Sequence, residues 1–168
     1  MQLDPQTLSI FIAATSVVIG VIFSVTSILM STRNANKSRQ AQIFMKFHEA
    51  MTEKEFFRDF QQVLGKWSWK DAEEFSSKYG PVSNPEKYNM FVRIVTQFDS
   101  IGSLVRYGLT NIKFMPRGVA IMVTSFWERF SPIASELETL WGNTDVFGEI
   151  EYLYDEIKHN RVSVHKDS

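Results

Sequence analysis

The segment PEKYNMFVRIVTQFDSIGSLVRY, residues 85–107, decides the fold class of this chain. Its large apolar side chains recur every three or four residues, which is the period of one face of an α-helix. Asn84 supplies a helix N-cap, Pro85 a first-turn proline and Gly108 a left-handed stop. The segment therefore predicts an amphipathic helix that buries one face in a helical core.

Helical spacing recurs on both sides of this segment. Thr52 and Glu55 have the spacing of a capping box, which predicts a helix that runs through Leu64. Further helices are expected at 71–78, at 117–130 and from 144 onward. The sequence shows no strand alternation and no hairpin turn, so we predict an all-α fold. A compact helical bundle should occupy residues 52–159, followed by a polar tail at 160–168.

The amino-terminal part contains the uncharged segment LSIFIAATSVVIGVIFSVTSILM, residues 8–30. As a helix this segment is roughly 34 Å long, enough to cross a hydrocarbon core of about 30 Å. We therefore expect residues 1–32 to form a single transmembrane helix that continues into a helical stalk over residues 33–51. A cleaved secretory signal and a buried helix of a soluble protein are the alternatives. The segment lacks the basic start of the former and is long for the latter.

Basic side chains follow the apolar segment, and only Asp4 precedes it as a charged residue. The nearest basic residues are Arg33, Lys37 and Arg39. Because such residues stay on the cytoplasmic side, the amino terminus is predicted outside the cell membrane and the bundle in the cytoplasm. The same three side chains either bind anionic lipid or only fix this orientation.

Small side chains recur every four residues within the apolar segment, at Ser16, Gly20 and Ser24. In lipid, small residues let two helices approach closely. The stripe is therefore consistent with packing against another membrane protein or a second copy of this chain. The alternative is that it only reflects the ordinary composition of a membrane segment.

The composition argues against several kinds of chemistry. The chain has 18 basic and 19 acidic residues, so it is not a general binder of nucleic acid, and it has no cysteine. His48 and Glu49 begin a zinc-protease pattern, but Thr52 stands where the second histidine is needed. Asp99 lies on the helix of residues 85–107, where a hydrogen bond or an ion pair within the domain is expected rather than catalysis. We predict no catalytic residue, no metal site and no cofactor.

Acidic residues gather near the carboxyl terminus, between residues 130 and 157, with no lysine or arginine before Lys158. The candidates for an acidic docking face are Glu136, Glu138, Asp145, Glu149 and Glu151. Such a run is either a solvated surface or a surface that docks a partner.

Three aromatic-rich motifs give a resemblance. They are FDSIGSLVRYGL at 98–109, FWERFSPI at 126–133 and VFGEIEYLYDEI at 146–157. Together with the amino-terminal segment, they resemble an uncharacterised family of small single-span proteins, catalogued as a domain of unknown function. The resemblance implies a membrane-anchored, all-helical cytoplasmic domain and implies no catalytic residue.

The expected function is that of a membrane-anchored, non-enzymatic interaction protein. It would serve as a scaffold or as an accessory or regulatory protein at the cytoplasmic face. The alternative is a membrane-tethered enzyme or effector whose carboxylates converge on a metal site in three dimensions.

Overall fold

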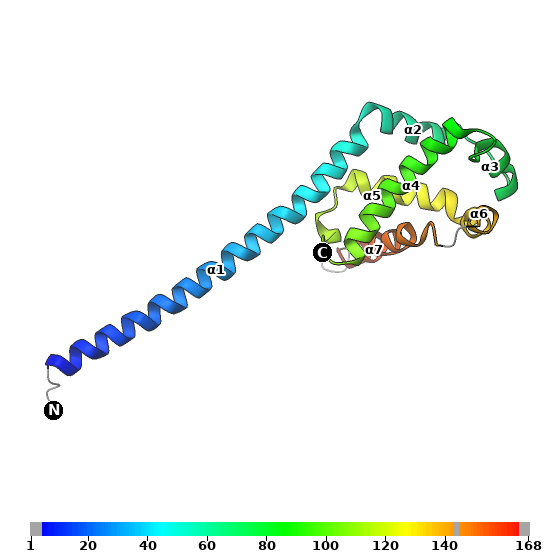
Figure 1. The fold of residues 1–168 in the computed structure, drawn as a ribbon. Helices are drawn as coiled ribbons and strands as arrows, with labels where there is room; N and C mark the ends of the chain where they lie inside the picture. The colour runs from blue at the N-terminus through cyan, green and yellow to red at the C-terminus, as the bar shows by residue number, and fades with distance from the viewer. Residues whose placement is uncertain (1–4, 143–144, 165–168) are drawn as a thin grey trace. The chain divides into compact units, whose positions relative to one another are not determined.

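The computed structural model describes residues 5–142 and 145–164, and the side chains of 22–142 and 145–160. The described residues form helices and their connections, without a strand (Figure 1). The α-helices are α1 (Pro5–Thr52), α2 (Lys54–Gly65), α3 (Ala72–Tyr79), α4 (Pro85–Arg106), α5 (Arg117–Phe130), α6 (Ala134–Trp141) and α7 (Gly148–Val164). The short 3₁₀ helices are η1 (Ile112–Phe114) and η2 (Ser131–Ile133). The predicted all-helical bundle is confirmed.

The predicted single transmembrane helix is overturned. Within the part of the chain that the structure describes, no helix has the length and apolar character needed to cross a membrane. In α1 the described side chains begin at Ile22, and the apolar run ends at Met30. Arg33, Lys37 and Arg39 follow in the same helix, and hydrocarbon disfavours such charges. The earlier part of the predicted span lies outside the described side chains. The expected location and orientation rested on this span and are untested.

The chain divides into two units, Met1–Arg39 and Gln40–Ser168. The first unit holds the greater part of α1, where Phe23 and Met30 are among the exposed apolar side chains. The second unit holds the end of α1 and all the other helices. Each candidate site described below belongs to the second unit.

Aromatic side chains fill the core of the second unit. In the bundle, α4 packs against α2, α3 and α7, while α5 packs against α7 and α6 against α3. The fully buried phenylalanines are Phe44, Phe75, Phe91, Phe98, Phe126, Phe130 and Phe147. The rings of Phe126 and Phe130 stack with centroids 4.5 Å apart. Each buried side chain of this size contributes about 1.5–3 kcal/mol, so the core fixes the helices in place.

The carboxyl-terminal end of α1 belongs to this core. Phe44 and Met51 are almost fully buried among side chains of the other helices. The hydroxyl of Thr110 also donates a hydrogen bond to the carbonyl of Gln40 at 3.5 Å. The last turns of α1 therefore stabilise the bundle directly.

The predicted capping box at the start of α2 is wrong. Thr52 is the last residue of α1, and its hydroxyl donates to the carbonyl of His48 at 2.9 Å. The N-cap of α2 is Glu53, which makes no side-chain capping bond. Thr52 is still helical, so its hydroxyl reaches back to the preceding turn and is unavailable to the next helix.

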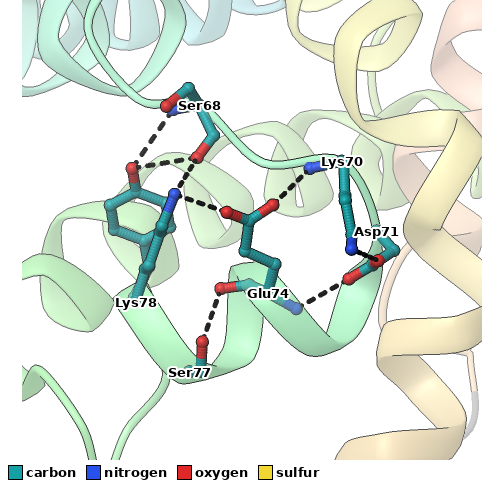
Figure 2. Close-up of polar contacts among 7 residues, drawn as sticks. Ser68, Lys70, Asp71, Glu74, Ser77 and Lys78 are labelled. Carbon is teal, nitrogen blue, oxygen red and sulfur yellow. Dashed lines mark hydrogen bonds and ion pairs between the residues drawn. The ribbon is translucent and has the colours of Figure 1, made fainter.

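A polar network fixes the start of α3 (Figure 2). The Asp71 carboxylate accepts from the backbone N–H of Glu74 at 2.8 Å, as an N-cap does. The Glu74 carboxylate accepts from the N–H of Lys70 at 2.8 Å and pairs with Nζ of Lys78 at 2.7 Å. The hydrogen bond from Lys78 lowers the pKa of Glu74. The ammonium of Lys78 also donates to the carbonyl of Ser68 at 3.2 Å, which ties the helix to the preceding loop.

Candidate functional site

An apolar groove lies between α4, α6 and the connection from α3 to α4. It encloses about 580 Å³, within the range of ligand pockets in proteins. Its lining is Ser76, Pro81, Val82, Ser83, Tyr88, Phe91, Val92, Val95, Thr96, Leu140, Trp141 and Val146. None of these side chains carries a formal charge. The groove therefore favours an apolar occupant, with a few hydroxyl groups available for hydrogen bonds.

The edges of the apolar groove expose large apolar side chains to water. Val82 is 92% exposed and Leu140 is 48% exposed, while Tyr88 and Trp141 are partly exposed. Single exposed apolar residues are common on protein surfaces, but these four surround one cavity. Their grouping is typical of a surface that another molecule covers.

The walls of the groove are held rigidly. Trp141 Nε1 donates to Oγ of Ser76 at 3.4 Å, which links the end of α6 to α3. The Tyr88 ring meets the Trp141 ring edge to face, with centroids 5.6 Å apart. The side chain of Asn84 accepts from the N–H of Lys87 at 3.2 Å, so the first turn of α4 is capped as predicted. The aromatic side chains of the groove are therefore positioned before any partner arrives.

The acidic residues predicted as a docking face separate into different surroundings. Glu138, Asp145 and Glu151 line one depression of about 300 Å³ beside α6 and α7. Glu149 pairs with Nε of Arg106 at 2.9 Å, and Glu136 is exposed on α6. The structure thus brings three of the five side chains together, and their docking role stays a prediction.

Asp99 lies on α4, one turn beyond Thr96 of the groove lining. Partial burial raises its pKa, and the negative charges of Glu149 and Asp145 raise it further. Three carboxylates therefore share the space where α4 meets the start of α7. We call Asp99 and Asp145 the acidic rim, because both lie next to residues that line the groove.

A family model matches most of the chain. The model of a domain of unknown function, DUF4760, matches residues 14–157. The chain belongs to this family. Comparisons with curated proteins and with solved structures find no match. The apolar groove and the acidic rim both lie within the matched range, so they are parts of the DUF4760 domain.

The match confirms the resemblance to an uncharacterised family, while a membrane character of that family is not shown. In this DUF4760 protein, the side chains of Arg33, Lys37 and Arg39 are exposed on α1, as is Ser24. The side chains of Ser16 and Gly20 lie outside those that the structure describes. Lipid contact and helix packing at these positions stay predictions.

The DUF4760 domain does not gather metal-binding side chains in its described part. No group of three or more His, Asp or Glu residues in that part has the arrangement to hold a metal ion. The carboxylates of the acidic rim place negative charge beside the groove. The groove is a feature of the structure that the sequence patterns did not predict.

Proposed function

We propose that this DUF4760 protein is a non-enzymatic interaction protein, acting as a scaffold or accessory protein. Its helical bundle binds a segment of a partner protein in the apolar groove. The observation that carries the proposal is the uncharged lining of the groove, with Val82 and Leu140 exposed at its edges.

The volume and the uncharged lining of the groove suit a helix or extended segment that inserts apolar side chains. Grooves that receive an amphipathic helix are apolar along their length and accept side chains at helical spacing. Tyr88 and Trp141 belong to the residue types that contribute most to binding energy at protein interfaces. Because core contacts already fix both rings, little ordering free energy is lost when a partner binds.

Site-specific cross-linking in the native cell tests this proposal. A photoreactive amino acid is placed at Val82 or at Leu140 of the full-length chain, and at Ile121 in a control. Ile121 is 47% exposed on α5 and does not line the groove. We expect the same discrete protein to be cross-linked from positions 82 and 140 but not from 121.

A second variant shows whether the groove itself binds the partner. With the photoreactive group at position 140, Val82→Asp should abolish the adduct, because it brings a charge to an apolar edge. Val82 is almost fully exposed, so this change should leave the melting temperature unaltered. Identical adducts from positions 140 and 121, or no adduct from either groove position, would refute the proposal.

A further inference from the structure

One face of α4 leads from the apolar groove to a carboxylate. Tyr88, Val92 and Thr96 follow each other at four-residue spacing and all line the groove. Asp99 comes three residues after Thr96, so it lies next on the same helix face. A partner helix that lies along α4 in the groove would therefore meet Asp99 at one end.

The connection between α6 and α7 brings a second carboxylate to the same end. Val146 lines the groove, and the exposed Asp145 directly precedes it. Asp145 has a left-handed backbone, with φ 68°. Its Oδ1 atom lies 1.9 Å from where a Cβ on Gly148 would be, so the carboxylate packs against the first residue of α7. The backbone thus holds Asp145 beside the groove.

The two carboxylates of the acidic rim outnumber the one basic side chain that acts on them, Arg106, whose charge interacts with Asp145. Among the described residues, neither Asp99 nor Asp145 forms an ion pair within 4.0 Å. Nearby Glu149, in contrast, is paired with Arg106. The acidic depression of Glu138, Asp145 and Glu151 continues the negative charge past the rim. One end of an uncharged groove is therefore negative.

We infer that the occupant of the groove is an amphipathic helix of a partner protein, with Lys or Arg side chains at the end beside Asp99 and Asp145. This inference rests on the proposed function and specifies the chemistry of the partner. Apolar side chains would fill the uncharged part of the groove, and the basic end would set the direction of the helix. Charge complementarity of this kind contributes mainly to orientation and to the rate of association.

Three synthetic peptides test the inference with the full-length chain. Each is a Leu/Ala amphipathic helix of about five turns, with two Lys, two Gln or two Glu residues at one end. Fluorescence anisotropy measures their affinities at low salt. We expect the Lys peptide to bind about tenfold more tightly than the Gln peptide, and the Glu peptide to bind most weakly.

Variants of the chain separate the two parts of the site. Asp99→Asn together with Asp145→Asn should make the Lys and Gln peptides bind equally. Asp155→Asn is the matched control, because Asp155 is an exposed carboxylate further along α7 and should not change the preference. Leu140→Ser should weaken all three peptides by a similar factor.

Several outcomes would overturn the inference and leave the proposed function to the cross-linking experiment. These are equal binding of the three peptides, no binding of the Lys peptide up to about 1 mM, and a Lys preference that Asp155→Asn also removes. Binding that Leu140→Ser leaves unchanged would place the peptide elsewhere. A dimer that forms with rising concentration and is lost in Leu140→Ser would make a second copy the occupant.

Discussion

At the scale of single residues, Gly102 allows the closest contact between α4 and α7. A Cβ atom at this position would lie 2.2 Å from the carbonyl oxygen of Glu149 and 2.8 Å from its carbonyl carbon. Both atoms belong to the backbone of α7 and cannot move aside alone. The absence of a side chain at Gly102 is therefore what lets these two helices pack.

Gly102→Ala should destabilise the bundle by about 1–3 kcal/mol, because it forces α4 and α7 apart. Thermal unfolding followed by circular dichroism measures the effect. Gly118→Ala in α5 is the control, since a Cβ there meets nothing within 4 Å. That change should leave the protein equally stable or stabilise it by up to about 1 kcal/mol. Similar melting temperatures for the two variants would contradict the close approach.

The N-cap of α3 gives a second prediction at this scale. Asp71→Ala removes the acceptor for the N–H of Glu74 and should destabilise the protein by about 1 kcal/mol. Glu73→Ala removes a charge from the same first turn without removing a capping bond, and should change stability by only a few tenths of a kcal/mol. Urea unfolding of both variants makes the comparison, and equal midpoints would argue against the cap.

At the scale of elements, a buried charge connects α2 to α4. The side chain of Asp59 on α2 is only 2% exposed, and its Oδ2 lies 3.3 Å from Nη1 of Arg93 on α4. Arg58 pairs with the other oxygen at 3.2 Å. Since a buried carboxylate without a partner is strongly unfavourable, this arrangement selects one register between the two helices.

Arg93→Leu should destabilise the protein by about 1–3 kcal/mol, because Asp59 then keeps only one basic partner. The double variant Arg93→Leu, Asp59→Leu should recover a large part of this loss, because it removes the buried charge as well. A double-mutant cycle from denaturant unfolding gives the coupling between the two residues. Additive effects of the single variants would show that the pair contributes nothing.

Sequence patterns predicted most of the elements of the second unit but not the groove. The N-cap at Asn84, the left-handed Gly108 and the start of α5 at Arg117 are all found in the structure. Each of these signals depends only on residues that are neighbours in the chain, so it can be recognised in the sequence. The groove was missed because Tyr88 and Trp141 belong to apolar helix faces. In the sequence, such a face has the same periodicity whether it is buried in the core or lines a groove. Whether such a face is covered depends on the neighbouring helices, which no local pattern specifies.

The start of α7 shows another limit of local patterns. The sequence predicted a helix from about residue 144, but α7 begins at Gly148. Asp145 adopts a left-handed backbone, which ends any helix that includes it. In the folded loop the carboxylate of Asp145 lies against Gly148, an arrangement that no local sequence pattern specifies.

At the scale of the whole molecule, charge is balanced overall but uneven locally. The formal net charge is −1, yet Asp99, Asp145 and Glu149 interact where α4 meets α7. The sequence already places Asp145 and Glu149 in one acidic run, but their proximity to Asp99 depends on how α4 packs against α7.

The raised pKa of Asp99 predicts a pH dependence of stability. Its pKa in the folded protein lies above its ordinary value of 3.8, so the folded state binds the proton more tightly than the unfolded state. Above the raised pKa the carboxylate is charged in both states, and its partial burial near two other carboxylates disfavours folding. As pH falls through the raised value towards 3.8, protonation removes this penalty.

Asp99→Asn should therefore raise the melting temperature at neutral pH, and the difference from the unmodified chain should vanish below pH 3.8. Scanning calorimetry across this pH range measures both effects. Asp155→Asn is a suitable control for the loss of one negative charge. A lower melting temperature for Asp99→Asn at neutral pH would show instead that the carboxylate stabilises the fold.

The burial of Phe44 and Met51 determines where the chain can be shortened. A truncated protein that starts at Gln40 keeps both side chains and should fold cooperatively and crystallise or give dispersed amide spectra. A truncated protein that starts at Lys54 lacks Phe44 and Met51. Their loss leaves two cavities in the core, so this protein should be prone to aggregation and proteolysis. Affinity tags and fluorescent labels therefore belong upstream of Gln40, and limited digestion should yield a resistant fragment that begins near that residue.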